Sequence, residues 1–321
     1  MPSLVTLDQV TEAAKHIDGV AVRTPLLPYP WSPGLWLKPE SLQPIGAFKV
    51  RGALNAVARL PEPARQAGVV CHSSGNHGQA LAYAANRFGI PSVVVMPDAS
   101  AQVKIDAVRA LGAEVVLVPA AERESRSAAI ARERGMSVIP PYDHPDVIAG
   151  QGTIGLEIAS DLPDVACVLV PVGGGGLSSG VSTALKALRP GVRVVGVEPA
   201  LAADAAESLA TDQLVAWPVE ATFRTAADGL RTNLSDLTFA HLRANLDGIV
   251  TVTEEEIFAT VGVLARMARL VAEPSGAVAT AAWLHHRDEL RDRFGVADGP
   301  TVAVVSGGNL DPAQLATLVA G

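Results

Sequence analysis

The segment QPIGAFKVRG, residues 43 to 52, contains Lys49 in a chain that carries most of its positive charge on arginine. Arginine keeps its proton in a protein, whereas a buried lysine amine can lose its proton and attack a carbonyl carbon. Lys49 is therefore a candidate nucleophile. The alternative is an ordinary surface lysine, and three glycine-containing loops elsewhere in the chain favour the nucleophile.

The first of these loops is SSGNHGQA, residues 73 to 80, which follows a short apolar run and opens a segment of helical period. Backbone N–H groups and small hydroxyls at a helix N-terminus favour an anion. The alternative is a capped turn between a strand and a helix. A cap needs one polar residue, and this loop supplies Ser73, Ser74, Asn76 and His77.

The second loop, VGGGGLSSG, has four consecutive glycines, Gly173 to Gly176. Without side chains, several backbone amides can approach one phosphate together. A rival interpretation is a dinucleotide site, because Gly173, Gly175 and Ser178 approximate the GxGxxG/A pattern and Glu198 ends the next apolar run. The rival explains neither Lys49 nor the first loop, so a phosphate-bearing ligand of another kind is favoured.

The third loop, VVSGGNL, residues 304 to 310, follows an apolar run and places the hydroxyl of Ser306 at the end of a predicted strand. Open α/β sheets bind their ligands at the carboxyl ends of strands. All three loops therefore belong to the edge of a sheet where a ligand would lie.

The elements that must position these loops alternate between short β-branched runs and longer alanine-rich stretches of helical period, from about residue 68 onward. This pattern predicts parallel sheets flanked by helices. A second series begins near residue 150, so we expect two α/β lobes joined by PPYDHPD, residues 140 to 146. The expected domains are a large one, residues 1–67 plus 146–321, and a small mobile one, residues 68–145.

The formal net charge of -8, with no basic block, argues against nucleic acid as a partner. No apolar run approaches the roughly 20 residues that span a bilayer, and MPSLVTLDQV has no targeting pattern. A cytoplasmic protein with a small-molecule ligand and no membrane partner is expected. Cys71 and Cys167 lack ligand or disulfide spacing and are expected to be buried free thiols.

Six segments, taken in order, resemble one enzyme family: GAFKVRGALNA, SSGNHGQALAYAA, VIAGQGTIGLEI, VPVGGGGLSSG, EPSGA and VSGGN. They resemble the β family, or fold type II, of enzymes that use pyridoxal phosphate, and within it the branch of serine racemases and serine/threonine dehydratases. The resemblance covers essentially the whole chain. It implies a two-lobed α/β fold in which the large domain binds pyridoxal phosphate.

By this resemblance Lys49 holds the cofactor as an internal aldimine, and the glycine loop binds its phosphate. Asn76 would contact the ring hydroxyl, Ser306 the pyridine nitrogen, and Glu273 would be the acid near the ring. The complete cofactor-binding set implied is Lys49, Phe48, Asn76, Gly173, Gly174, Gly175, Gly176, Glu273 and Ser306.

The resemblance also implies the substrate-binding residues, which are Ser73, Ser74, Gly75, Asn76, His77 and Arg126. Lys49 would act as general base at Cα on one face of the substrate. Ser74 resembles the base on the opposite face in serine racemases, and its alternative role is a helix cap. Arg126 resembles an arginine that reaches the pocket from the small lobe; the alternative is a surface charge beside Glu122.

The segment EPALAAD resembles a divalent-cation site of the same branch. Its ligands would be the carboxylates of Glu198 and Asp204 with the carbonyl of Ala202. Oxygen ligands of this kind suit magnesium or calcium, in a structural role. Without the resemblance, the two acids would be read as solvated surface residues.

The sequence therefore predicts a dehydratase that converts a β-hydroxy amino acid, L-threonine or L-serine by default, to a 2-oxo acid and ammonia. Serine racemisation and dehydration of 3-hydroxyaspartate are the alternatives; an NAD-binding protein or an idle pyridoxal-phosphate protein is disfavoured. Two departures from the branch, Ala47 in place of a serine and Pro44 in place of a threonine-like residue, leave the substrate's identity open. The family usually forms homodimers.

Overall fold

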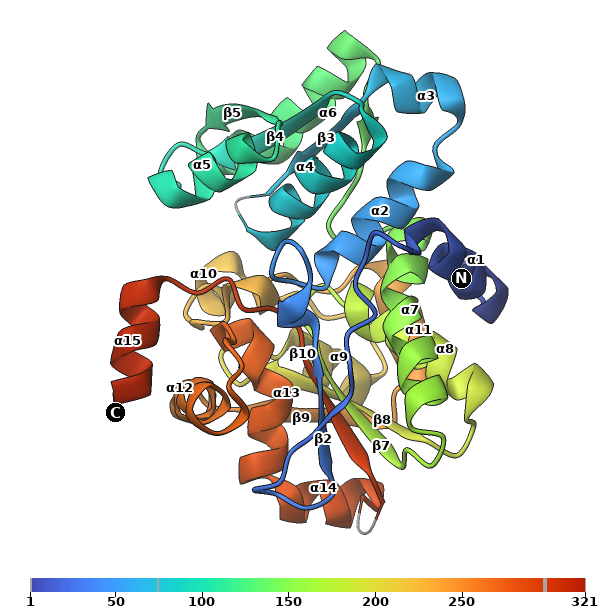
Figure 1. The fold of residues 1–321 in the computed structure, drawn as a ribbon, viewed down its shortest axis with the longest axis vertical. Coiled ribbons are helices and arrows are strands. Elements are labelled where there is room, and N and C mark those ends of the chain that lie inside the picture. The colour runs from blue at the N-terminus through green and yellow to red at the C-terminus, as the bar shows by residue number, and fades with distance from the viewer. Residues whose placement is uncertain (1, 74, 297–298, 321) are drawn as a thin grey trace.

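The computed structural model describes residues 2–73, 75–296 and 299–320, and these form two lobes, each built on its own sheet (Figure 1). The strands of the larger sheet, in spatial order, are β1 (Leu27–Pro28), β2 (Leu35–Pro39), β10 (Thr301–Val305), β7 (Cys167–Pro171), β8 (Arg193–Pro199) and β9 (Gly248–Val252). Only the β1–β2 pair is antiparallel. The predicted largely parallel sheet is thereby confirmed for this lobe.

The smaller sheet is parallel throughout. Its strands, in spatial order, are β5 (Glu114–Val118), β4 (Ser92–Pro97), β3 (Val69–His72) and β6 (Ser137–Val138). The central strands β3 and β4 are almost fully buried, which is why their sequences read as continuous apolar runs instead of alternating ones.

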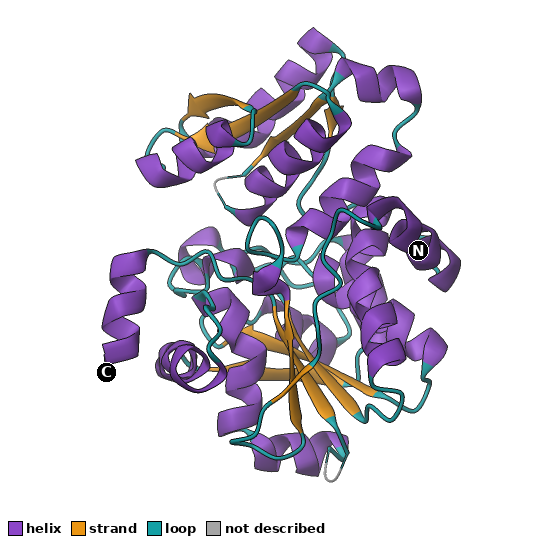
Figure 2. Cartoon of the chain, viewed as in Figure 1, coloured by secondary structure: helices purple, strands orange, loops and turns teal. Residues whose placement is uncertain are grey.

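Helices lie on both sides of each sheet (Figure 2). The α-helices are α1 (Leu7–Ile17), α2 (Lys49–Arg59), α3 (Glu62–Ala67), α4 (Asn76–Phe88), α5 (Gln102–Ala110), α6 (Arg123–Arg134), α7 (Pro145–Asp161), α8 (Gly176–Leu188), α9 (Asp204–Thr211), α10 (Val219–Thr222), α11 (Asp236–Asn245), α12 (Glu254–Val263), α13 (Pro274–His285), α14 (Arg287–Phe294) and α15 (Pro312–Ala320). Short 3-10 segments are η1 (Glu40–Leu42), η2 (Ala120–Glu122) and η3 (Asp228–Leu230), and a π turn, η4 (Leu264–Ala268), follows α12. In the larger lobe, α13 packs on β10, β7, β8 and β9, and α8 contacts β7 and β8.

Helix α2 connects the two lobes. Its buried face, with Val50, Ala53 and Val57, shares one hydrophobic cluster with β3 and α4 of the small lobe. It also packs against α7 of the large lobe. The two sheets fall on either side of the boundaries expected near residues 67 and 145, and the division into a large and a small mobile domain stays a prediction.

The carboxyl ends of β3, β7 and β10 lead into the three loops that the sequence singles out. In Figure 1 these ends of the upper and lower sheets face one another between the lobes. A hydrogen bond from Asn309 Nδ2 to Asn76 Oδ1 joins the third loop to the first across this region. Parallel strands have thus brought the loops together, as expected for an open α/β sheet.

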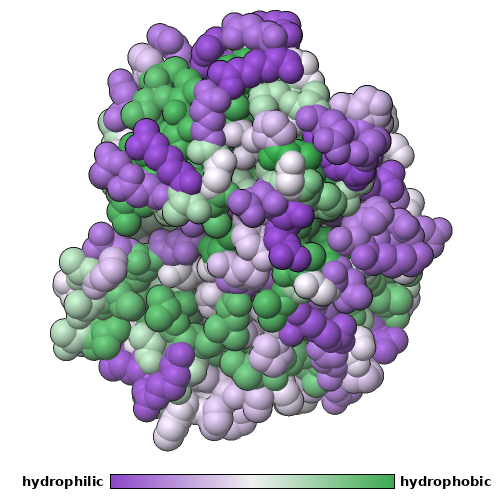
Figure 3. Space-filling view, turned by 45° about the horizontal axis from the view of Figure 1, so that its top comes forward, coloured by the Kyte–Doolittle hydropathy of each residue, from purple (hydrophilic) through white to green (hydrophobic). Residues whose placement is uncertain are grey.

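The surface is a mosaic of hydrophilic and hydrophobic residues, with green hydrophobic areas on both lobes in Figure 3. Large apolar side chains that are exposed include Leu117 and Val138 on the small lobe and Met267 and Val271 on the large lobe. Within the described ranges, no helix is both long and apolar enough to cross a membrane. Cys71 and Cys167 are buried free cysteines, as predicted.

Candidate active site

Lys49 is the first residue of α2, and its half-buried side chain extends to the connection between the lobes. Its Nζ donates a 2.6 Å hydrogen bond to the carbonyl oxygen of Pro141 and lies 5.0 Å from the centre of the Phe48 ring. Desolvation of the amine lowers the pKa of Lys49 to about 8. A substantial fraction of this amine is therefore neutral near pH 8, which is the form that attacks a carbonyl carbon.

The third loop lies directly beside Lys49. The N–H of Phe48 donates to the carbonyl of Ser306 at 3.0 Å, and Ala47 forms an isolated antiparallel bridge with Gly307. Ser306 is buried, and its hydroxyl donates to the carbonyl of Ser275 at 3.3 Å. The structure therefore brings Lys49, Phe48 and Ser306 together, as the resemblance implies.

The four-glycine loop forms a backbone cradle at the start of α8. A Cβ atom at Gly173, Gly174, Gly175 or Gly176 would lie 2.7–2.8 Å from a neighbouring atom, so no larger residue fits without a shift. Gly175 has φ +83°, which also favours glycine. Within the described residues, the amides of Gly173, Gly174 and Gly175 have no hydrogen-bond acceptor, and α8 has no side-chain cap. Such a set of free N–H groups fits a phosphate.

Tyr142 packs against this cradle and was not singled out from the sequence. A Cβ at Gly174 would meet its ring carbons, and one at Gly176 would meet its Cβ. Burial first, and then the nearby Asp143 and Asp204 charges, raise the pKa of Tyr142 to about 12, so the phenol stays protonated. An aromatic residue inside an otherwise Pro- and Asp-rich connection was the signal that could have found it.

Asn76, the first residue of α4, connects the small lobe to two residues of the large lobe. Its Nδ2 donates to Glu273 Oε1 at 2.7 Å, and its Oδ1 accepts from Asn309 Nδ2 at 2.7 Å. Asn309 also donates to the carbonyl of Ile45 at 2.8 Å. Sequence reasoning missed Asn309, although it ends the segment VSGGN.

The Glu273 carboxyl is buried, and its protonation follows from that position. Burial first, and then the charge of Asp228, raise the pKa of Glu273 to about 8, although the hydrogen bond from Asn76 opposes the shift. Glu273 is therefore largely protonated at neutral pH. A neutral carboxyl near a cofactor ring would be a hydrogen-bond donor as well as an acceptor.

His77 is buried in the same region. Its Nε2 bonds to the carbonyl of Ile139 at 2.8 Å, which makes Nε2 the protonated nitrogen. Nδ1 is buried without a partner among the residues that the structure describes. Burial first, and then the charge of Lys49, lower the pKa of His77 to about 3, so the imidazole is neutral and presents a free acceptor.

The Ser73 hydroxyl accepts from the N–H of Gly75 at 3.2 Å. Ser74, predicted to be a catalytic base, lies outside the described residues. Arg126 donates to Glu133 at 3.1 Å on the surface of α6, and not to Glu122 as the surface interpretation expected. Contact of Arg126 with a substrate stays a prediction.

The predicted cation ligands Glu198 and Asp204 are buried, so their interpretation as solvated surface residues is wrong. Glu198 accepts from the N–H groups of Ala205 at 3.1 Å and Ala206 at 2.7 Å. This geometry points its carboxylate at the start of α9. Both oxygens are thereby engaged by α9, whereas the dinucleotide interpretation needs this acid to bond the ribose of the ligand.

The pKa values of both carboxyl groups are raised. Burial, and then the charge of Asp204, raise the pKa of Glu198 well above its ordinary value. Burial also raises the pKa of Asp204 to about 6. Asp204 Oδ2 accepts from the Leu234 N–H at 3.1 Å, whereas Oδ1 is buried without a partner among the described residues. Within the described ranges there is no group of three or more His, Cys, Asp or Glu residues arranged to hold a metal.

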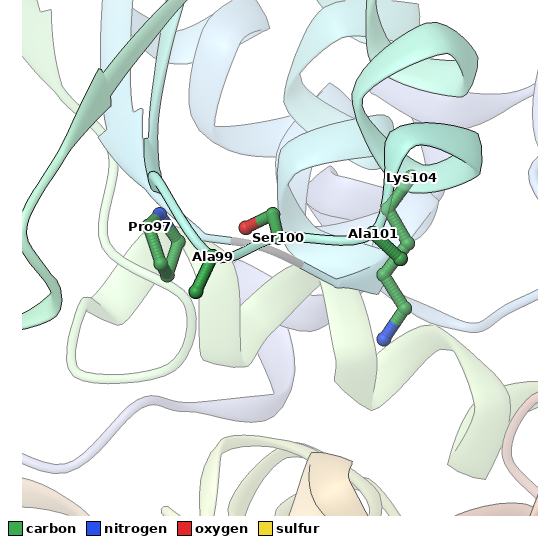
Figure 4. A pocket seen from close by; sticks show the side chains of 5 residues that line it. All are labelled: Pro97, Ala99, Ser100, Ala101 and Lys104. Atoms are coloured by element: carbon green, nitrogen blue, oxygen red, sulfur yellow. The ribbon is translucent and has the colours of Figure 1, made fainter.

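A cavity of about 230 Å³ lies between the carboxyl end of β4 and the start of α5 and is drawn in Figure 4. Its polar members do not converge: the Ser100 hydroxyl and the Lys104 amine point in different directions. Lys104 Nζ instead lies 3.3 Å from Asp228 Oδ2 of the large lobe. One residue that lines the cavity thus also contacts the large lobe.

Residues 17–307 match the family described as pyridoxal-phosphate dependent enzyme. L-threonine ammonia-lyase of Geobacter sulfurreducens is 43% identical over 290 residues, covering 89% of this chain and 69% of that protein. L-threo-3-hydroxyaspartate ammonia-lyase of Saccharomyces cerevisiae is 37% identical over 325 residues, covering 98% and 97%. The solved structure of maize serine racemase has a TM-score of 0.93 at 34% identity and covers 98% of this chain and 97% of that one.

Proposed function

Because the chain belongs to the family of pyridoxal-phosphate dependent enzymes, we propose that it is an ammonia-lyase acting on a β-hydroxy amino acid. The default substrates are L-threonine and L-serine, and the products are a 2-oxo acid and ammonia. Relatives named L-threonine ammonia-lyase support this assignment. The observation that carries it is the Lys49 amine, whose pKa is lowered to about 8 and which bonds to Pro141, the neighbour of the Tyr142 that packs against the glycine cradle.

The residues present fit the cofactor. The Lys49 amine would bind its aldehyde covalently, and the free amides of Gly173, Gly174 and Gly175 would hold its phosphate. Ser306 and Glu273 would face the ring. When bound, pyridoxal phosphate supplies an aldehyde for the two amines, that of the lysine and that of the substrate, and an electron-withdrawing ring that acidifies Cα.

In the reaction, the Lys49 amine takes the proton from the substrate Cα, since a base with a pKa near the working pH both accepts and returns a proton efficiently. The Pro141 carbonyl holds Nζ and so orients its lone pair. His77 stays neutral at Nδ1 and offers an acceptor without adding a second positive charge. The protonated Lys49 amine can then pass this proton to the β-hydroxyl, which leaves as water. The released unsaturated amine takes up one water and is hydrolysed to the 2-oxo acid and ammonia.

Two alternative activities rest on relatives. Serine racemases of Schizosaccharomyces pombe and Arabidopsis thaliana are 36% and 39% identical to this chain. The hydroxyaspartate ammonia-lyases match nearly the full length of both chains. Racemisation needs a second base on the face opposite Lys49, for which the sequence offers Ser74.

We further infer that magnesium or calcium binds Glu198, Asp204 and the carbonyl of Ala202. Two buried carboxylates with raised pKa values, and an Asp204 oxygen without a partner among the described residues, support a cation there. Hard cations take oxygen ligands of this kind. The role would be structural, because Asp204 begins α9. A homodimer and a cytoplasmic location stay predictions, and sedimentation tests the first.

The test mixes purified holoenzyme with a panel of L- and D-serine, L-threonine and threo-3-hydroxyaspartate. It measures 2-oxo acid, ammonia and enantiomer composition together. Ammonia and 2-oxo acid in equal amounts from at least one substrate, lost in Lys49→Ala, is the expected result. Colour and cofactor content without any turnover across the panel would contradict the lyase assignment.

A further inference from the structure

On the side of α2 away from Lys49, four charged side chains are buried together; we name Lys38, Glu40, Arg51 and Glu157 the buried charge network. The first three have 0% exposure and Glu157 has 8%. The network holds two positive and two negative charges, so it is neutral overall. Buried charges of this kind persist only when each is paired and hydrogen-bonded.

Arg51 is the centre of the network. Its guanidinium donates to both oxygens of Glu40, at 2.7 and 2.9 Å, and to both oxygens of Glu157, at 2.6 and 2.9 Å. It also donates to Thr153 Oγ1 at 3.1 Å and to the carbonyl of Val22 at 3.0 Å. All three guanidinium nitrogens of Arg51 donate hydrogen bonds, so six acceptor contacts fix the position of the group.

These contacts join separate elements of the large lobe. Glu40 belongs to η1, Arg51 to α2, and Glu157 to α7. Lys38, on β2, donates to Glu157 Oε2 and to the carbonyl of Thr24, each at 2.5 Å. The network therefore fixes α2 against β2, η1 and α7.

Helix α2 begins at Lys49 itself, and its N-cap residue Phe48 supplies no side-chain hydrogen bond. The N–H of Arg51 donates to the carbonyl of Phe48 and the N–H of Gly52 to Gln151 Oε1, which caps the turn in part. The N–H groups of Lys49 and Val50 have no acceptor among the described residues, and a first turn with such groups frays readily. Arg51 lies two residues beyond Lys49, and at about 100° per residue the two side chains leave the helix on nearly opposite sides. The network therefore fixes the first turn of α2 on the side opposite to the Lys49 amine.

We propose that Arg51 is the positioning residue for Lys49: its four bonds to Glu40 and Glu157 hold the incompletely capped first turn of α2, and with it the amine, at the cofactor. This rests on the proposed covalent role of Lys49. Arg51→Lys keeps the charge but cannot bond two carboxylates in a bidentate manner. The first turn of α2 then loosens, water reaches Nζ, and the desolvation that lowers its pKa decreases.

The experiment measures Lys49 directly in the cofactor-free protein. Competitive acetylation between pH 6 and 10, read by mass spectrometry with the exposed Lys15 as internal standard, gives the pKa of Lys49. Absorbance titration gives the affinity for pyridoxal phosphate. In Arg51→Lys we expect the pKa of Lys49 to rise by about one unit, and the neutral fraction at pH 7 and the affinity to fall about tenfold.

The matched control is Ile158→Ala, a buried core residue of α7 beside Glu157 that makes no bond in the network. If Ile158→Ala lowers the thermal midpoint as much as Arg51→Lys does, we still expect it to leave the pKa of Lys49 and the affinity for pyridoxal phosphate unchanged. Equal shifts in both variants would reduce Arg51 to a general stability residue and overturn the proposal. Unchanged values in a folded Arg51→Lys would overturn it as well.

If Arg51→Lys does not fold, Glu157→Gln takes its place. The amide keeps one oxygen acceptor for Arg51 and removes the negative charge of residue 157. A smaller shift in the same direction supports the proposal, and none contradicts it. Lys49→Ala separates this outcome from the proposed function. A borohydride-stable cofactor adduct that persists in Lys49→Ala would refute the covalent role of Lys49, whatever Arg51 does.

Discussion

Asn76 Nδ2 donates a 2.7 Å hydrogen bond to Glu273 Oε1, which joins the first residue of α4 in the small lobe to the residue that precedes α13 in the large lobe. Asn309 Nδ2 donates to the oxygen of the same amide, Asn76 Oδ1, at 2.7 Å. The amide orientation of Asn76 is therefore set by the large lobe. A residue expected at the cofactor ring thus also connects the lobes.

Glu273→Gln is expected to change the pH dependence of stability. The folded pKa of about 8 lies above the unfolded value of about 4.3, so the native state binds more protons between these values. The native protein should therefore lose unfolding free energy as pH rises from about 5 to 8, by at most about 1.4 kcal/mol per unit. Urea denaturation of cofactor-free protein at pH 5, 6.5 and 8 measures it. Parallel pH profiles for the native protein and Glu273→Gln would refute the assignment.

Gly174→Ala is expected to weaken binding of pyridoxal phosphate by about tenfold or more, since the new methyl group would lie 2.7 Å from the Tyr142 ring and disturb the cradle. Gly191→Ala is the matched control, because no atom lies within 4 Å of its Cβ position. Absorbance titration gives both affinities. Partial recovery in Gly174→Ala with Tyr142→Ala would confirm the steric cause, whereas normal affinity in the single variant would exclude the cradle.

The cation site predicts sensitivity to chelators. Removal of a bound cation leaves Glu198 and Asp204 as two buried acids, and the charge of Asp204 raises the pKa of Glu198. The fold is then destabilised through repulsion or forced protonation. We expect a chelator to lower the thermal midpoint and magnesium or calcium to restore it. Metal content and chelator sensitivity that are the same in Asp204→Ala and in the native protein would show that the cation, if any, binds elsewhere.

Ser74→Ala is expected to separate two activities. Lys49 reaches one face of the substrate, whereas racemisation needs a second proton donor on the other face. The variant should lose turnover of D-serine by about 10²- to 10⁴-fold while elimination from the L-substrate keeps a measurable rate. Enantiomer-resolved assays measure both. Full retention of D-serine turnover rules out the second base, and an equal fall in both activities assigns Ser74 to positioning.

The strand-end loops could be predicted from sequence because their chemistry is local. Each signal is contained in a segment of about ten residues: the four consecutive glycines, the motif around the lysine and the buried β-branched runs. Strands β1, β2, β6 and β9 were not predicted; Leu35–Pro39, for example, is a short run of mixed residues that does not stand out by periodicity alone. The parallel arrangement then placed the loops together without further information.

The partners of these residues could not be predicted, because they are distant in the sequence. Pro141 is 92 residues from Lys49, and Glu157 is 106 residues from Arg51. Arg126 shows the same limit at short range. Helical spacing suggested Glu122, but the side chain extends along α6 to Glu133. Only the packed helices decide which acceptor is within reach.

The covalent role of Lys49 is tested most directly by reducing the holoenzyme with borohydride, digesting it and sequencing the labelled peptide by mass spectrometry. The expected result is a single pyridoxyl group on Lys49, in the peptide that contains GAFKVRG, with no label in Lys49→Ala. A pyridoxyl group on Lys38, Lys104 or Lys186 in the native protein, or no label in a holoenzyme that contains the cofactor, would contradict it.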